Sequence, residues 1–200
     1  ILWLVAEAPE LKGLEDAHAA STVGVFRSIF EVLKVKQNWF AGIYASLVNL
    51  PIFLLGGFAG GMYLVQVHGL TRTHASFVNG MLFFGMIFGS PVYGFLSDKF
   101  RQRRMPMVVG AVLSLVLFLA IMFTSTDNVF GLSTLFFLFG FAISSQVISY
   151  PLVVESNSLQ LTGTAEGLAS FWIMAGGLTQ NLFAWMLNYN GGYTVSAGEP

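Results

Sequence analysis

Long blocks of apolar residues alternate with short polar segments along this chain of 200 residues. Five blocks are long enough to be membrane-spanning helices, because a helix rises 1.5 Å per residue and the hydrocarbon core of a bilayer is about 30 Å thick. We expect these spans at residues 39–67, 76–96, 107–123, 130–154 and 165–187. The pattern therefore predicts an all-α fold, a polytopic bundle of transmembrane helices.

The segments outside the five spans are predicted to be loops of a longer bundle. Residues 1–37 open with a six-residue apolar run that is too short to cross a bilayer, so we expect it to end a preceding span. Residues 27–36 carry a short apolar stripe, which favours an interfacial helix in a cytoplasmic inter-domain loop; a solvated linker helix is the alternative. Residues 189–200 are predicted to form an extracytoplasmic loop before a missing last span. We therefore expect a fragment cut at both ends.

The composition agrees with a lipid environment. The chain is 55% hydrophobic and 10% charged, with a mean hydropathy of +0.72, whereas a soluble domain is typically about 25% charged. A net charge of -1 and a pI near 6.3 give no basic surface for nucleic acid. The absence of cysteine excludes disulfides, thiolate metal ligands and a Cys nucleophile. The three histidines lack ligand spacing, so we expect no metal and no cofactor. The sequence has no phosphate-binding loop motif, so an ATP-driven pump would need a separate subunit.

The basic residues predict the orientation in the membrane, because Lys and Arg are enriched in cytoplasmic loops. With the five spans placed as above, eight of the basic residues lie in loops on one side: Lys12, Arg27, Lys34, Lys36, Lys99, Arg101, Arg103 and Arg104. Arg72 lies on the other side, and all nine basic residues are outside the spans. We therefore expect the eight-residue side to be cytoplasmic.

The loop between the second and third predicted spans contains the sequence GFLSDKFRQRR at residues 94–104. It resembles the signature of the Major Facilitator Superfamily, which has a glycine, an aspartate, a basic residue, an apolar residue, a second glycine and a basic pair. The positions that fit are Gly94, Asp98, Lys99, Phe100, Arg103 and Arg104, and Arg101 stands in place of the second glycine. Residues 150–168 are similar to the junction of spans 10 and 11 in that family, and residues 1–10 to the end of span 6.

This resemblance implies that the chain is the C-terminal half of such a transporter, covering about spans 7 to 11. The N-terminal half would then be its partner within the same protein, which we expect to be monomeric and to lie in a bacterial inner (plasma) membrane. The resemblance also implies that the signature loop is a gate that joins the cytoplasmic ends of the two halves. Gly94 would permit close helix approach, and Asp98 would accept hydrogen bonds from the N–H groups at the N-terminus of a helix in the other half. We interpret Glu155 and Glu166 as orienting or gating groups.

Polar side chains inside the spans are the candidates for a substrate cavity. Ser145, Gln146, Ser149 and Tyr150 have i, i+3 and i+4 spacings along one helix side, so they either face a cavity or form hydrogen bonds between packed helices. Weaker candidates on the other spans are Asn49, Tyr63, Asn79, Trp172, Gln180 and Asn181, together with Tyr44. The glycine pairs 56/60, 57/61 and 85/89 have the spacing that allows close helix crossing.

We expect a secondary active transporter that moves a small polar or amphipathic organic solute by alternating access. No ionisable residue lies well inside the five spans, so a proton or sodium site would lie mostly in the other half. An intramembrane enzyme would need a nucleophile with its base, or a metal cluster, within the bilayer, and the spans contain neither. A non-transporting membrane receptor or scaffold of the same fold is the alternative.

Overall fold

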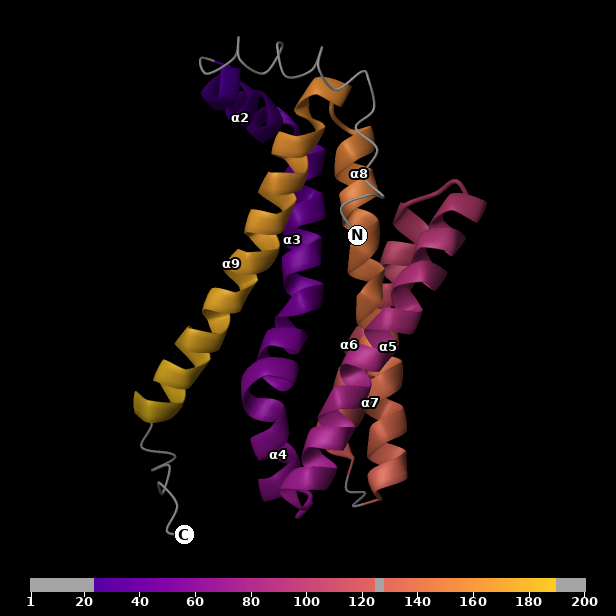
Figure 1. Cartoon of the computed structure of the whole chain (residues 1–200), viewed down its shortest axis with the longest axis vertical. Coiled ribbons are helices and arrows are strands. Elements are labelled where there is room, and N and C mark those ends of the chain that lie inside the picture. Colours follow the sequence, from indigo (N-terminus) through magenta and orange to yellow (C-terminus); the bar gives the residue numbers. More distant parts are fainter. Residues whose placement is uncertain (1–23, 125–127, 190–200) are drawn as a thin grey trace, which may run out of the picture.

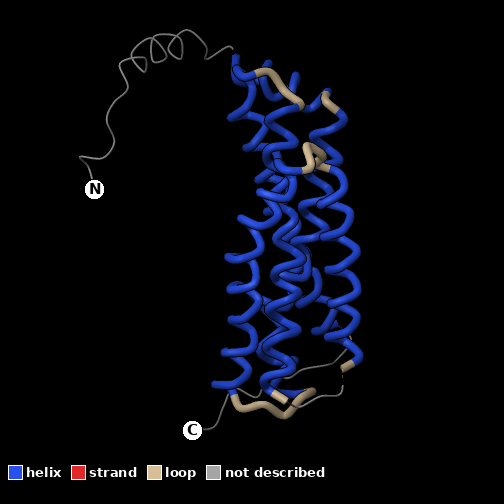
Figure 2. Tube along the Cα trace, turned by 90° about the vertical axis from the view of Figure 1, so that its right-hand side faces the viewer, coloured by secondary structure: helices blue, strands red, loops and turns tan. Residues whose placement is uncertain are grey.

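The computed structural model describes residues 24–124 and 128–189. Within these ranges the chain consists of helices and short turns and contains no strand, and the long helices run nearly parallel in one elongated bundle (Figure 2). The all-α transmembrane bundle predicted from the sequence is therefore confirmed. The proposed end of a preceding span at residues 1–6, Lys12 and the loop at 190–200 lie outside the described residues.

The helices follow one another in an up-and-down path (Figure 1). The first part of the path comprises α2 (Gly24–Lys34), α3 (Lys36–Pro51), the π-helical segment η1 (Ile52–Ala59), α4 (Gly60–Gln66), α5 (Arg72–Lys99) and α6 (Arg104–Phe123). The second part comprises α7 (Val129–Ile143), the 3₁₀ segment η2 (Ser144–Ile148), α8 (Ser149–Glu155), the 3₁₀ turn η3 (Leu159–Leu161) and α9 (Thr162–Tyr189).

Four stretches of the described chain have the length and apolar composition to cross a membrane. They are Lys36–Gly57, Arg72–Lys99, Arg104–Phe123 and Val129–Glu155, and they coincide with the first four predicted spans apart from their ends. Helix α9 runs continuously through the region predicted as the fifth span but does not belong to this set. Its crossing of the membrane stays a prediction.

The two ends of the bundle differ in charge. Figure 1 places α2, the start of α3, the α5–α6 loop and the α8–α9 turn together at one end. This end, called the basic end below, carries Arg27, Lys34, Lys36, Lys99, Arg101, Arg103 and Arg104. The opposite end contains α4 and the start of α5, where Arg72 lies. The described loops that were predicted to lie on the cytoplasmic side therefore lie at the same end of the bundle.

The centre of the bundle is the crossing of α5 and α7. A Cβ atom added at Gly85 would collide with the carbonyl oxygen of Phe137, and one added at Gly140 would collide with that of Leu82. A Cβ atom added at Gly89 would likewise collide with the Ser144 hydroxyl oxygen. Around the crossing, fully buried side chains fill the core: Val78, Leu82, Ile121, Leu132, Phe136, Phe139 and Ile143. The predicted glycine pair at 85 and 89 therefore does lie at a close helix crossing.

The first long helix changes its hydrogen-bonding pattern after Pro51. Proline lacks an N–H group and its ring crowds the preceding turn, and the chain continues as the π-helical segment η1 for eight residues. A Cβ atom at Gly60 would collide with the carbonyl oxygen of Leu55, five residues earlier. The π-helical segment thus begins after Pro51, and Gly60 permits its wide turn because it has no side chain to collide with Leu55. Wide turns of this kind occur frequently at functional sites.

Helix α2 is amphipathic and lies beside the basic ends of α3 and α9 (Figure 1). Val32 on its inner face is fully buried against Ala41, Val153 and Ala169. On its outer face Phe26 and Phe30 are exposed. This arrangement supports the interfacial helix predicted from the sequence, whose contact with the membrane surface stays a prediction.

Candidate functional site

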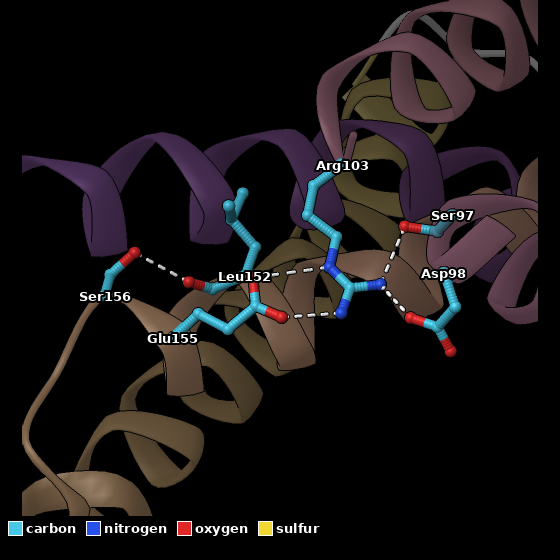
Figure 3. Close-up of polar contacts among 6 residues, drawn as sticks. All are labelled: Ser97, Asp98, Arg103, Leu152, Glu155 and Ser156. Atoms are coloured by element: carbon cyan, nitrogen blue, oxygen red, sulfur yellow. Dashed lines mark hydrogen bonds and ion pairs between the residues drawn. The ribbon is translucent and has the colours of Figure 1, made fainter. Parts of the chain in front are cut away.

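Arg103 joins the ends of two helices that are far apart in the sequence (Figure 3). Its Nη1 donates to Asp98 Oδ1 at 2.5 Å and to Ser97 Oγ at 2.9 Å, both near the C-terminus of α5. Its Nη2 donates to Glu155 Oε1 at 2.6 Å and its Nε to Glu155 Oε2 at 3.4 Å, at the C-terminus of α8. One guanidinium therefore connects the C-terminal end of α5 to the C-terminal end of α8.

The electrostatics of this position favour a cation. Helix C-termini carry partial negative charge, and Arg103 lies between two of them, each with a carboxylate. The hydrogen bond to Glu155 raises the pKa of the Arg103 guanidinium, desolvation lowers it by a smaller amount, and the bond to Asp98 raises it again. The Arg103 side chain is 20% exposed, whereas those of Asp98 and Glu155 are 70% and 54% exposed. The group is therefore charged at physiological pH and shielded more than its partners.

Asp98 retains hydrogen-bonding capacity beyond Arg103. Its Oδ1 accepts from Arg103, and its other carboxylate oxygen accepts no hydrogen bond from any described residue (Figure 3). The sequence predicted that this carboxylate meets the N-terminus of a helix in the other half. The structure adds a partner within the described chain and leaves one oxygen available for the predicted contact.

The other residues of the signature loop differ in their surroundings. A Cβ atom added at Gly94 would meet nothing within 4 Å, so no helix of the described chain approaches it closely, and its close approach to another helix stays a prediction. Lys99 Nζ lies 5.9 Å from the centroid of the Phe95 ring, and Arg104 is exposed. Arg101 has a φ of 50°, a left-handed backbone conformation that glycine adopts without strain. This is the position at which the family pattern has its second glycine.

A second polar contact at the basic end was not found from the sequence. Asn157 Nδ2 donates to Asn38 Oδ1 at 2.8 Å, and Asn38 Nδ2 donates to Asn157 Oδ1 at 3.1 Å. The same amide nitrogens also donate to the carbonyl oxygens of Val32 and Val153. Asn38 is 1% exposed. This pair joins the α2–α3 corner to the α8–η3 turn, and it left no signal because the two asparagines lie in different segments without any motif.

The polar residues near η2 are buried among helices. Ser145 Oγ and Tyr44 Oη lie 2.9 Å apart, and Tyr44 Oη donates to the Met107 carbonyl oxygen at 2.8 Å. Ser149 Oγ donates to the carbonyl oxygen of Gln146, whose own Oε1 is buried without a partner in the described chain. Tyr150, half-buried, packs against the cluster around Val32. These are contacts of the helix-packing kind, and a cavity-lining role for the four candidates remains a prediction.

Two of the remaining candidates, Tyr63 and Asn79, form hydrogen bonds to the backbone of neighbouring helices. The hydroxyl of Tyr63 donates to the carbonyl oxygen of Ile121 at 2.9 Å and lies 3.3 Å from His68 Nε2. The amide of Asn79 donates to the carbonyl oxygen of Gly56 at 3.2 Å, and its Oδ1 is buried without a partner in the described chain.

The other four candidates lie on α3 and α9. Asn49 is buried, and Asn181 is exposed. The indole of Trp172 lies 5.1 Å, centroid to centroid, from that of Trp39 and covers Gly42. A Cβ atom added at Gly57 would lie 3.7 Å from the Gln180 amide nitrogen. Of the ten candidates, Asn79 is the one that lines the cavity described next.

A cavity of about 560 Å³ lies between η1, α4 and α5 in the half of the bundle toward the opposite end. Its polar lining comes from Gln66, Arg72, Ser76 and Asn79, and glycines 56, 57 and 61 widen it. Arg72, Ser76 and Asn79 follow one face of α5 at i, i+4 and i+7. The cavity combines one cation with amide and hydroxyl groups, which suits a small polar or amphipathic molecule.

Comparison with known proteins adds a family and a relative. The family model of the Major Facilitator Superfamily matches residues 1–180. The tetracenomycin C resistance and export protein of Streptomyces glaucescens is 29% identical over 139 residues, which are 64% of this chain and 25% of that protein. The chain thus matches about a quarter of the length of this relative. No solved structure matches the chain significantly.

Proposed function

The chain belongs to the Major Facilitator Superfamily, and on that premise we propose that it is part of a secondary active transporter. The transporter moves a small polar or amphipathic organic solute across a bacterial inner membrane by alternating access, with coupling to a proton or sodium gradient. Its relative is named for resistance and export, so export is the direction to test first.

The observation that carries this proposal is a set of hydrogen bonds and ion pairs that join the helix ends at the basic end. Arg103 ties the end of α5 to the end of α8, and Asn38 with Asn157 ties α2 and α3 to the turn after α8. Hydrogen bonds of this kind, one set charged and one set neutral, can be broken and remade at modest cost. In the proposed mechanism they hold the helix ends of this half together while the basic end is closed, and they loosen when it opens.

The cavity between η1, α4 and α5 supports the second element of the mechanism, access to a solute from the opposite end. It lies toward the end away from Arg103, and Gly61 on its wall has open space where a side chain would stand. A solute in this cavity would be reached from the opposite end while the basic end is fastened. The π-helical segment η1 forms part of the wall, and a wide helical turn there offers a place where the span can bend.

Asp98 would couple the closure of this half to the other half. Arg103 orients the carboxylate, and its second oxygen is available to the N–H groups at a helix N-terminus. A favourable contact between a carboxylate and a helix N-terminus contributes up to about 2 kcal/mol. That is enough to shift a two-state equilibrium by about tenfold or more.

Labelling of an introduced cysteine tests this mechanism in the full-length protein. A Gly61→Cys reporter in a background without other accessible cysteines should react from the opposite end, and Asp98→Asn or Glu155→Gln should lower that rate by up to about tenfold, because each weakens closure of the basic end. Glu166→Gln is the matched control, since Glu166 is an exposed carboxylate at the same end without an ion pair in the described chain. Equal rates in all variants would contradict the gating role.

Transport itself is tested with the full-length protein in proteoliposomes. Radiolabelled neutral, anionic and cationic organic solutes would be offered with and without an imposed proton or sodium gradient. Saturable movement that responds to the gradient supports the proposal. A folded protein that moves none of them, and whose reporter rate does not respond to Asp98→Asn, would favour a receptor or scaffold.

A further inference from the structure

A second cavity, of about 410 Å³, lies between α5 and α6 at the basic end. Its lining is apolar apart from one amide and one phenol: Val92, Tyr93, Leu96, Phe100, Gln102, Met105, Pro106, Val109 and Phe141. Its floor is the contact of Tyr93 with Phe141, whose ring centroids lie 5.7 Å apart. This mostly apolar cavity next to the α5–α6 loop is called the slot below.

The slot exists because α5 and α6 pack on α7 rather than on each other over most of their length. The close glycine crossing holds α5 against α7, and α6 packs on α7 and η2. On the open side of the slot, Phe100, Met105 and Val109 are each more than half exposed. The outer face of α6 is apolar and exposed along its whole length at Val108, Val109, Val112, Leu115, Val116 and Leu119. In a membrane protein such a face contacts lipid, so the slot opens toward acyl chains.

Basic residues directly adjoin the lining residues of the slot in the chain. Arg101 stands between the lining residues Phe100 and Gln102, and Arg104 directly precedes Met105. Neither arginine has an ion-pair partner in the described chain, because Arg103 occupies the two nearby carboxylates. Lys99 lies over the exposed Phe95 ring and adds a third cation at the same level. The slot therefore has an apolar interior and a cationic rim.

We propose that this slot binds an anionic glycerophospholipid, with one acyl chain against the apolar lining and the phosphate on Arg101 and Arg104. Basic pockets between transmembrane helices at the membrane surface are suited to anionic headgroups. Arginine also forms charge-assisted, paired hydrogen bonds with phosphate oxygens. Both parts of the ligand are required, because the phosphate selects the charge and the chain selects a lipid over a soluble phosphate.

Another cavity in the bundle offers an internal contrast. It lies at the opposite end between the starts of α5 and α7, measures about 550 Å³ and is lined by Phe77, Met81, Asn128, Val129, Phe130, Ser133, Thr134 and Phe137. No Lys or Arg belongs to its lining. It can hold an acyl chain but has no group that would distinguish an anionic from a zwitterionic headgroup. Charge selectivity should therefore depend on Arg101 and Arg104.

Native mass spectrometry of the purified full-length protein in detergent tests this inference. Dioleoyl phosphatidylglycerol, with one negative charge, should bind more tightly than dioleoyl phosphatidylcholine. A surface Lys or Arg changes affinity for anionic lipid by about fivefold, so Arg101→Gln with Arg104→Gln should weaken phosphatidylglycerol binding by about tenfold or more and leave phosphatidylcholine unchanged. Arg72→Gln, which removes a basic residue at the opposite end, is the matched control.

Two further experiments distinguish binding of a whole lipid from binding of a phosphate group alone. Glycerol 3-phosphate at the same concentration should not displace the lipid, because it lacks the chain. Val109→Trp, which fills the slot from its exposed side, should weaken phosphatidylglycerol binding with both arginines in place. Equal affinity for the two lipids, an equal effect of Arg72→Gln, or full displacement by glycerol 3-phosphate would each overturn the proposal. None of these outcomes depends on whether the protein transports a solute.

Discussion

The crossing of α5 and α7 predicts different changes in the free energy of unfolding for two alanine substitutions in one helix. Gly85 and Gly80 both lie within α5, so either change replaces glycine by alanine in a helix interior and removes the same propensity penalty, about 1 kcal/mol. A Cβ at Gly80 meets nothing within 4 Å. A Cβ at Gly85 collides with the Phe137 carbonyl oxygen and comes within 2.8 Å of the Phe141 backbone nitrogen. Backbone atoms cannot rotate aside, so the two helices must separate.

The magnitudes follow from these two terms. Overpacking of a close-packed site costs about 1–3 kcal/mol, and the propensity gain offsets about 1 kcal/mol of it. Gly85→Ala should therefore leave the free energy of unfolding unchanged or lower it by up to about 2 kcal/mol, whereas Gly80→Ala should raise it by about 1 kcal/mol. The difference between the variants, about 1–3 kcal/mol, isolates the collision because the propensity term cancels.

Reversible unfolding of the full-length protein in mixed micelles, titrated with sodium dodecyl sulfate, measures both variants. Gly140→Ala supplies a second test, because its Cβ would collide with the Leu82 carbonyl oxygen at the same crossing. Once one alanine has separated the helices, the second should cost less, so the double variant should lose less than the sum of the singles. Equal midpoints for Gly85→Ala and Gly80→Ala would refute the close crossing.

Two further predictions concern the basic end. Arg101→Gly should be more stable than Arg101→Ala by about 1 kcal/mol, because both remove the charge and glycine alone accepts the left-handed backbone without cost; the same titration checks this, and equal stability would contradict it. Asn38→Ala and Asn157→Ala should each lower the free energy of unfolding by about 1–3 kcal/mol, because each leaves the amide oxygen of the other asparagine without its donor. Their double variant should lose clearly less than the sum, and full additivity would argue against the paired amides.

The sequence predicted what depends on local pattern. The apolar blocks predicted the four stretches that are long and apolar enough to cross a membrane. The structure extends three of them by a few residues and ends the first at Gly57 rather than at residue 67. The spacing of Gly85 and Gly89 indicated a close crossing, and the structure supplies the α7 backbone and Ser144 as their neighbours. Both succeed because hydropathy and small-residue spacing act within one helix.

Contacts between distant segments could not be predicted in the same way. Glu155 was recognised as an orienting or gating group, but its partner Arg103 is 52 residues away, and nothing in either segment specifies the pairing. The π-helical segment after Pro51 was also missed, although a proline followed by a cluster of glycines is a usable signal. The pairing of Asn38 with Asn157 depends entirely on how α3 and α8 meet.

The arginine at position 101 connects the backbone of the loop to its charges. The family pattern has a glycine at this place, a residue that accepts a left-handed backbone freely, whereas in this chain an arginine adopts that conformation at a cost. The strain is local, because the turn still brings Arg103 between Asp98 and Glu155. A cation at a costly position has no role in that network, since Arg101 has no ion pair in the described chain. The anionic headgroup proposed above would give this charge a function that glycine could not perform. Loss of lipid selectivity in Arg101→Gly, together with its higher stability than Arg101→Ala, would separate the two effects.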